Sequence, residues 1–169
     1  VVAIDPAVTA TEDSDETGIV CVGLGFDGHL YVLADASGRY TPKEWSQRAL
    51  YLYSEFGASC VIGETNNGGD LIETVLRTAV GGSHVPYKKV TASRGKYMRA
   101  EPVAAVWEQG RGHIVGSLPD LEDQMCTFVP DGDMPNDRLD ALVWAGTELL
   151  VTERVMPRAQ PGVTYEEAY

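Results

Sequence analysis

The segment from Pro135 to Leu150 constrains the fold most, because it combines an apolar helical face with carboxylates on its first turns. Its apolar residues recur at the spacing of a helix packed on a core: Leu139, Leu142, Val143, Gly146, Leu149 and Leu150. Asp137 and Asp140 are three residues apart, so their side chains share one side of this helix. Carboxylates beside an apolar face are costly unless a positive charge meets them. The segment therefore predicts a core helix with a cation at its acids, and a metal ion is one such cation.

The two aspartates also have a simpler explanation. A negative charge on the first turn of a helix is favoured by the helix dipole, which would account for Asp137. Asp140 would then be a solvated residue at the margin of the apolar face. Acidic residues elsewhere in the chain are needed to distinguish a solvated helix start from a cation site.

Length and composition bound the class of protein. The 169 residues, 44% of them hydrophobic, predict one globular domain over residues 1–152 and a flexible tail over 153–169. No apolar run approaches the roughly 18 residues of a membrane span, so no membrane partner is expected. The chain begins without an initiator Met or a basic leader, which indicates a piece of a longer protein. Its cysteines lack disulfide or metal-ligand spacing and are expected to be reduced core residues of a cytosolic protein: Cys21, Cys60 and Cys126.

The hydrophobic pattern predicts an α/β chain. Apolar, β-rich runs predict strands at residues 1–4, 17–24, 30–34, 59–64 and 86–91. Amphipathic runs predict helices at residues 42–56, 70–80, 94–109 and 119–128, in addition to the acidic helix described above. Pro102 is expected to break the third of these helices. Three consecutive strands followed by alternating helices and strands indicate one mixed sheet flanked by helices.

Two of the predicted strands end in an acidic residue. Asp5 closes the first strand, and Pro6 restricts the backbone of Asp5 to the extended region. Glu64 closes the strand at 59–64, and Gly63 before it leaves room for a close backbone approach. Either acid alone could simply belong to a turn. Together with the two helix-borne aspartates, they supply hard oxygen ligands for two divalent ions about 3.5–4 Å apart, an arrangement that hydrolyses phosphodiesters.

Three segments carry a resemblance to a known family: Asp5-Pro6-Ala7, Gly63-Glu64-Thr65-Asn66, and the run from Asn136 to Ala145. In order and spacing they resemble the C-terminal nuclease domain of bacteriophage large terminases, a family similar in fold to ribonuclease H and Holliday-junction resolvases. The resemblance implies a ribonuclease H-like mixed sheet flanked by helices. It also implies a metal-dependent DNA endonuclease that cuts concatemeric viral DNA during genome packaging in the host cytoplasm.

The resemblance further implies roles for single residues. Asp5, Glu64, Asp137 and Asp140 match the positions at which the family holds Mg²⁺ or Mn²⁺, with two ions in the active complex. Asn136 stands where the family commonly has the first Asp of a pair, which leaves the main helix-borne ligand open. We expect Asp140 to be a direct ligand and Asp137 to be a second ligand or outer-shell support.

The implied partners are double-stranded DNA, an ATPase motor domain in the same full-length chain, the portal and the small terminase subunit. The sequence contains no Gly-x-x-x-x-Gly-Lys-Ser/Thr nucleotide-binding loop, so the motor is expected outside this segment. Six basic residues within residues 88–111 predict one DNA-contacting surface: Lys88, Lys89, Arg94, Lys96, Arg99 and Arg111. A solvated helix face explains them equally well. The net charge of −12 opposes DNA binding, so the domain by itself is expected to bind DNA weakly.

Two other functions fit the same residues. A Holliday-junction resolvase or a transposase-like strand transferase would use the same carboxylates and would prefer branched DNA. A non-catalytic interaction module would use the acids only as helix caps and turns, and the acidic composition supports that alternative. The three tryptophans are expected to pack in the core or between elements: Trp45, Trp107 and Trp144. No role is assigned to the three histidines.

Overall fold

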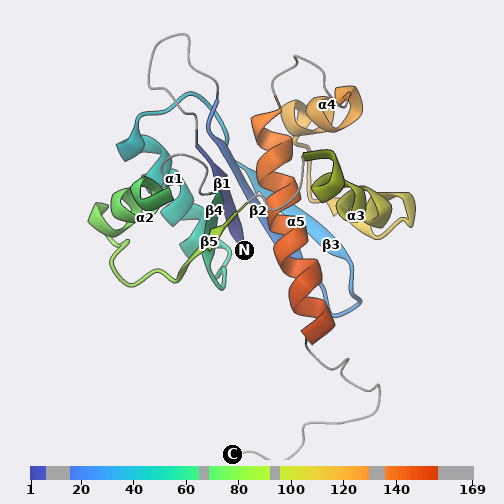
Figure 1. The fold of residues 1–169 in the computed structure, drawn as a ribbon, viewed down its shortest axis with the longest axis horizontal. Helices are drawn as coiled ribbons and strands as arrows, with labels where there is room; N and C mark the ends of the chain where they lie inside the picture. Colours follow the sequence, from blue (N-terminus) through green and yellow to red (C-terminus); the bar gives the residue numbers. More distant parts are fainter. Residues whose placement is uncertain (7–15, 65–68, 92–95, 130–135, 156–169) are drawn as a thin grey trace, which may run out of the picture.

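A computed structural model describes residues 1–6, 16–64, 69–91, 96–129 and 136–155, apart from the side chains of residues 69–70, 96–97 and 151–155. The chain forms a six-stranded sheet with helices on both faces (Figure 1). The strands are β1 (Val2–Asp5), β2 (Gly18–Leu24), β3 (Leu30–Asp35), β4 (Val61–Glu64), β5 (Tyr87–Val90) and β6 (Gly112–Ile114). The helices are α1 (Pro42–Glu55), α2 (Gly69–Thr78), α3 (Lys96–Glu108), α4 (Pro119–Thr127) and α5 (Asp137–Val155). Residues 153–155 of the expected tail thus belong to α5, and its remainder, 156–169, lies outside the described residues.

The strand order β5-β4-β1-β2-β3-β6 combines parallel and antiparallel pairs. β2 runs antiparallel to both β1 and β3, and every other neighbouring pair is parallel. The carboxyl ends of all strands except β2 therefore lie at one edge of the sheet. Asp5, Asp35 and Glu64 end β1, β3 and β4 there, and these three residues define what we call the acidic edge. This architecture confirms the predicted α/β fold with a mixed sheet flanked by helices.

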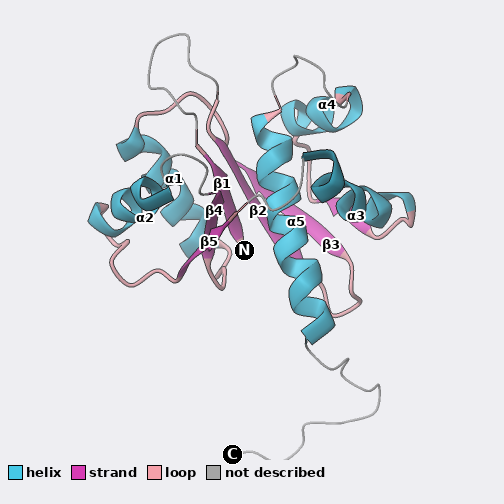
Figure 2. Ribbon diagram, viewed as in Figure 1, coloured by secondary structure: helices cyan, strands magenta, loops and turns pink. Residues whose placement is uncertain are grey.

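Two apolar cores lie on the two faces of the sheet. Successive residues of a strand point to opposite faces, so Ala3 belongs to the core under α5, whereas Val2 and Ile4 belong to the core under α1 and α2. Figure 2 shows α3, α4 and α5 on one side of the sheet and α1 and α2 on the other. None of the described helices combines the length and the apolar composition needed to cross a membrane.

α1 begins with a capping box. The Thr41 hydroxyl accepts a hydrogen bond from the backbone N–H of Glu44 (3.4 Å), and Glu44 Oε2 accepts one from the backbone N–H of Thr41 (2.9 Å). The bonds donated by the Thr41 backbone and hydroxyl lower the pKa of the Glu44 carboxyl. These contacts explain why the helix begins at Pro42.

Two local predictions are wrong. Pro102 lies inside α3 and does not break it. Its ring is exposed, and the buried side chains of Val103 and Val106 hold the helix in place despite the lost backbone hydrogen bond. Cys126 is exposed on α4, whereas Cys21 is a buried core residue as expected. The short amphipathic pattern of α4 leaves one side of that helix in solvent, and Cys126 falls on it.

The first turn of α5 makes unusually close contact with the sheet. Gly18, the first residue of β2, lies so near the backbone carbonyl of Asp137 that no Cβ atom could be accommodated between them. Gln124 of α4 caps the same turn, because its Oε1 accepts hydrogen bonds from the backbone N–H groups of Arg138 (3.1 Å) and Leu139 (3.2 Å). The start of α5 is therefore fixed to both β2 and α4.

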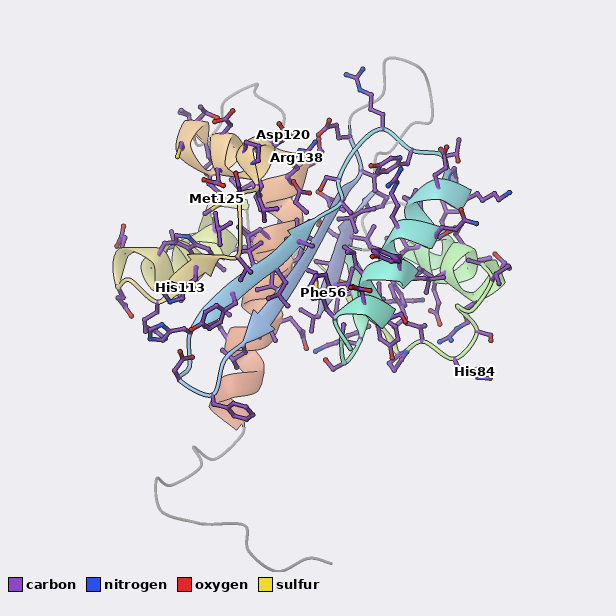
Figure 3. All side chains as sticks on the ribbon, turned by 180° about the vertical axis from the view of Figure 1, so that it is seen from behind. Phe56, His84, His113, Asp120, Met125 and Arg138 are labelled. Atoms are coloured by element: carbon purple, nitrogen blue, oxygen red, sulfur yellow. The ribbon has the colours of Figure 1, made fainter. Side chains whose placement is uncertain are left out.

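Arg138 adds an ion-pair network to this anchor. Its Nε lies 3.0 Å from Glu16, its Nη1 2.7 Å from Asp35 and its Nη2 3.6 Å from Asp120. Figure 3 shows Arg138 and Asp120 beside each other where α5 meets α4. The side chains of Arg138 and Asp35 are only 11% and 5% exposed. Burial alone would lower the pKa of Arg138, but the carboxylates of Asp35 and Glu16 outweigh it and raise that pKa, so Arg138 stays charged.

The contact at Gly18 predicts that Gly18→Ala destabilises the protein by about 1–3 kcal/mol, because a backbone carbonyl cannot move aside without displacing α5. Gly23→Ala is the matched control in the same strand, since a Cβ atom there would meet only Leu33 at an ordinary 3.5 Å. Urea unfolding of both variants measures the difference. Equal stabilities would show that α5 does not depend on this contact.

The network around Arg138 predicts that Arg138→Met destabilises the protein by about 3–5 kcal/mol, because the buried Asp35 loses its counter-charge. Adding Asp35→Asn to that variant should recover part of the loss. Arg77→Met is the control, since the Arg77–Glu73 pair is exposed and worth at most about 1 kcal/mol. Chemical unfolding of the three variants tests this, and an Arg138→Met protein as stable as Arg77→Met would contradict it.

Candidate functional site

Asp5 and Glu64 end neighbouring parallel strands in matching register. The residues just before them are partners in the β1–β4 ladder, so the two acids stand side by side. Ala3 and Ile62, two positions earlier on each strand, both belong to the core under α5. Because side chains alternate along a strand, Asp5 and Glu64 project to that same face.

The first two turns of α5 bring further acids to this place. Asp5 pairs with Gly18 across β1 and β2, and Gly18 abuts the backbone of Asp137. The Oδ2 atom of Asp137 is fully buried. Asp140 lies one turn before Trp144 on the same side of α5, and Trp144 reaches the end of β4. The start of α5 therefore lies over the face of the sheet to which Asp5 and Glu64 project.

The donor set at this edge suits a hard divalent cation. The side chains that supply ligands here are carboxylates, whose oxygens are preferred by Mg²⁺ and Mn²⁺. The Oδ2 atom of Asp137, one of these oxygens, is buried away from solvent. Within the described ranges, no three His, Cys, Asp or Glu side chains stand close enough together to form a metal-ligand group. Asp5, Glu64, Asp137 and Asp140 are the residues that could hold such ions.

Glu64 is held by two residues of the neighbouring helices. The indole Nε1 of Trp144 donates a hydrogen bond to Glu64 Oε2 at 3.0 Å. Arg99 of α3 places its Nη1 3.8 Å from the same oxygen and stacks its guanidinium 4.2 Å above the Trp144 ring. The side chains of Glu64 and Arg99 are 11% and 14% exposed, so these contacts lie in a largely desolvated environment.

The structure does not assemble the predicted basic surface as a whole. Lys88 and Lys89 lie on β5 beside β4, where Lys88 Nζ binds both oxygens of Glu148 at 2.8 Å and Lys89 lies 3.4 Å from Glu73. The side chains of Arg94 and Lys96 lie outside the described residues.

Arg111 precedes β6 at the other end of the sheet, where its Nη1 donates to the carbonyl of Gly28 at 3.1 Å. The prediction of one continuous basic surface is therefore wrong for Arg111. Helix α3, which precedes Arg111 in the sequence, packs on α5, whereas β6, which follows Arg111, extends the sheet beyond β3. Basic residues that are close in the sequence therefore lie on different sides of the molecule.

Gly63 serves packing rather than access to the site. A Cβ atom on Gly63 would meet Ile72 and the Tyr87 hydroxyl at 2.9 Å, so α2 and β5 fill the space beside it. The Tyr87 hydroxyl is buried with no hydrogen-bond partner among the described residues. Burial, and then the negative charge of Glu73, raises the pKa of Tyr87 to about 12, so Tyr87 is neutral at physiological pH.

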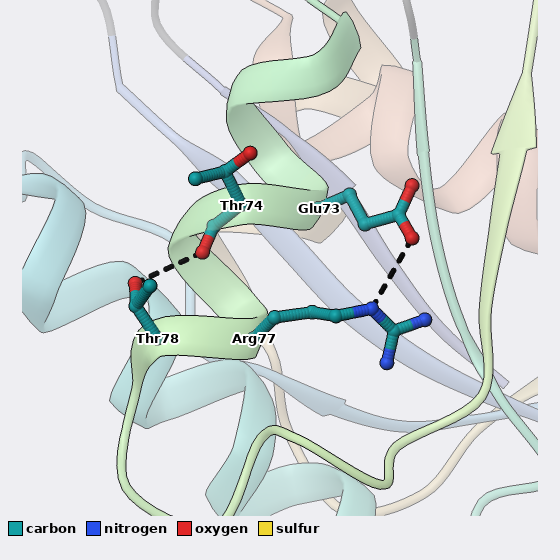
Figure 4. Close-up of a pocket in the computed structure, with 4 residues that line it drawn as sticks. All are labelled: Glu73, Thr74, Arg77 and Thr78. Carbon is teal, nitrogen blue, oxygen red and sulfur yellow. Dashed lines mark hydrogen bonds and ion pairs between the residues drawn. The ribbon is translucent and has the colours of Figure 1, made fainter.

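A surface hollow of about 480 Å³ lies on α2, away from these carboxylates (Figure 4). Two of its contacts lie within this helix: Arg77 pairs with Glu73 at 3.2 Å, and the Thr78 hydroxyl donates to the Thr74 carbonyl at 2.9 Å. These contacts belong to an ordinary exposed helix surface. We assign no function to this hollow.

Asp35 and the roles of Arg138 and Trp144 were not predicted from the sequence. Asp35 ends a strand in acid as Asp5 and Glu64 do, and that signal could have identified it as a member of the acidic edge. The roles of Arg138 and Trp144 depend on contacts with residues distant in the sequence, such as Asp35, 103 positions from Arg138, and Glu64, 80 positions from Trp144, and no local pattern indicates them.

Comparisons with known proteins agree with this fold. The family model described as "Terminase RNaseH-like domain" matches residues 2–148. No curated protein matches the sequence. Similar solved structures include the yeast mitochondrial Holliday junction resolvase Ydc2, with a TM-score of 0.57 and 9% identity, over 88% of this chain and 76% of that one.

RuvC of Thermus thermophilus is also similar, with a TM-score of 0.54 and 16% identity over 92% of this chain and 97% of that one. The T. thermophilus RuvC in complex with a Holliday junction substrate gives 0.53 and 14% over 91% and 96%. At these identities the similarity is one of fold. The family match covers nearly the whole described domain, and the chain therefore belongs to the terminase RNaseH-like domain family, as a nuclease domain of the ribonuclease H-like fold.

Proposed function

We propose that this domain is a divalent-metal-dependent endodeoxyribonuclease that cuts concatemeric viral DNA during genome packaging. The observation that carries the proposal is the matching register of Asp5 and Glu64, which aims both acids at the face covered by α5. Membership of the terminase family supports the packaging role. In that role the domain acts in the host cytoplasm, with an ATPase motor domain in the same full-length chain and with the portal and the small terminase subunit.

Each carboxylate has a distinct place in the proposed site. Asp5 and Glu64 would hold ions from rigid strand ends, Asp140 would hold them from α5, and Asp137, whose Oδ2 atom is buried, would support them from the first turn. Bound Mg²⁺ or Mn²⁺, as a pair of ions, would supply an activated water and stabilise the leaving 3′ oxygen. The apolar face of α5 fixes the distance between the helix acids and the strand acids.

Lys88, Lys89 and Arg99, with Arg94 and Lys96, are the proposed contacts to the DNA backbone. The side chains of Lys88 and Lys89 are 55% and 44% exposed, so their ammonium groups can exchange a glutamate for a phosphate. Arg111 has no part in this surface because of its place near β6. The net charge of −12 still opposes binding, so the motor domain or other packaging proteins are expected to present the DNA.

The proposal predicts that the domain nicks or linearises plasmid DNA in Mg²⁺ or Mn²⁺, and that Asp5→Asn and Glu64→Gln each lower the rate on the order of 100-fold or more, because each removes an ion ligand. Asp140→Asn should cost more than Asp137→Asn, since Asp140 lies one turn before Trp144, which bonds to Glu64 at the end of β4. Gel analysis of supercoiled plasmid measures all four variants.

Glu55→Gln and Glu108→Gln are the matched controls, because both carboxylates are exposed at the C-terminal ends of α1 and α3, which lead into the amino ends of β4 and β6, opposite the acidic edge. They should cleave like the parent protein. Undiminished cleavage by Asp5→Asn and Glu64→Gln would end the assignment. Calorimetry that detects no divalent-ion binding would instead favour the non-catalytic interaction module.

A junction-resolving activity is the second candidate, favoured by the fold shared with Ydc2 and RuvC. As a packaging nuclease, the domain should cut a linear duplex at least as fast as a four-way junction of the same arm sequence. A comparison of single-turnover rates on the two substrates tests this. A preference of about tenfold or more for the junction, roughly 1.4 kcal/mol in transition-state binding, would favour the resolvase function.

A further inference from the structure

Trp144 makes two different contacts at the end of β4. The indole N–H of Trp144 donates a hydrogen bond to Glu64 Oε2 at 3.0 Å. The Arg99 guanidinium stacks on the face of the same ring, 4.2 Å from its centroid. Trp144 is itself only 5% exposed and belongs to the core under α5. An indole nitrogen can only donate, so the direction of the bond to the carboxylate is fixed.

The two contacts differ in what they do to the charge of Glu64. A neutral N–H donor orients the carboxylate and leaves its negative charge available to a cation, whereas a guanidinium bound directly would neutralise it. Arg99 stands at 3.8 Å from Oε2, beyond hydrogen-bond distance, and its Nε is buried without a hydrogen-bond partner among the described residues. Arg99 is thus held more by the Trp144 ring and by charge than by hydrogen bonds.

We propose that Trp144 is a positioning residue for the metal site: its N–H fixes the carboxylate plane of Glu64, and its ring keeps Arg99 from binding that carboxylate directly. This inference rests on the proposed function, because it assigns Glu64 to the ions. A packing role alone would explain the burial of Trp144. It would not explain a donor aimed at one carboxylate oxygen and a cation placed on the ring beside the same oxygen.

Trp144→Phe separates the two roles, because phenylalanine keeps an aromatic ring in the core and loses the N–H. It should weaken Mn²⁺ binding about tenfold, the usual effect of losing a group that orients a metal ligand. Trp107→Phe is the control, since Trp107 packs against Gly112 of β6 and not at the end of β4. The affinity is measured on the 169-residue chain by titration with Mn²⁺ and detection of the free ion by electron paramagnetic resonance.

The indole N–H signals of the three tryptophans give a second test that does not depend on the folding of Trp144→Phe. Glu64→Gln should shift the Trp144 signal upfield in a ¹⁵N correlation spectrum, because the acceptor loses its charge, and leave those of Trp45 and Trp107 in place. Mg²⁺ should move the same signal in the parent protein. A Trp144 signal that responds to neither change would overturn the inference.

Glu64→Gln in the Mn²⁺ titration distinguishes the inference from the function on which it rests. If Glu64→Gln weakens Mn²⁺ binding and Trp144→Phe does not, Trp144 has only a packing role while the metal site stands. If Glu64→Gln leaves Mn²⁺ binding unchanged, the assignment of Glu64 fails and the positioning role fails with it. Weaker binding in both variants, with Trp107→Phe unchanged, supports both.

Discussion

The contact between the first turn of α5 and the start of β2 determines where the helix-borne acids lie relative to the sheet. Gly18 allows the helix backbone to rest directly on the strand that pairs with β1, so the distance from the helix acids to Asp5 is set by backbone packing and not by mobile side chains. Arg138 then ties the same turn to β3 and to α4. A helix anchored at its first turn and packed along its length on the sheet is a rigid support for catalytic carboxylates.

Two arginines carry much of the electrostatic balance at the acidic edge. Arg138 and Arg99 have side chains only 11% and 14% exposed, and each lies beside a strand-end carboxylate, Asp35 and Glu64 respectively. Their partners differ in kind. Arg138 bonds its carboxylates at 2.7–3.0 Å and is a structural tie, whereas Arg99 keeps its distance from Glu64 and rests on an aromatic ring. The same residue type thus supports the fold at one strand end and modulates the charge of a proposed ligand at another.

The parts of this structure that follow local rules could be predicted from the sequence. Asp5 and Glu64 were recognisable because each ends an apolar run, and Asp137 and Asp140 because they interrupt an apolar helix. The parts that depend on the order of strands in the sheet could not. Arg111 belongs to the far flank because β6 joins β3, and Trp144 reaches Glu64 because α5 packs against β4 as well as β1 and β2. Pro102 stayed within α3 because burial of its neighbours outweighed a local rule.

The register of β1 against β4 also bears on how such a domain can change in evolution. A strand alternates its side chains with a period of two, so the deletion or insertion of one residue within Val2–Asp5 or Val61–Glu64 would turn the terminal acid toward α1 and α2. The deletion or insertion of two residues would keep the acid on the face covered by α5 and would shift it along the strand. We therefore expect relatives that keep the chemistry to vary in the connections after each acid. Within these two short strands, we expect only changes by an even number of residues.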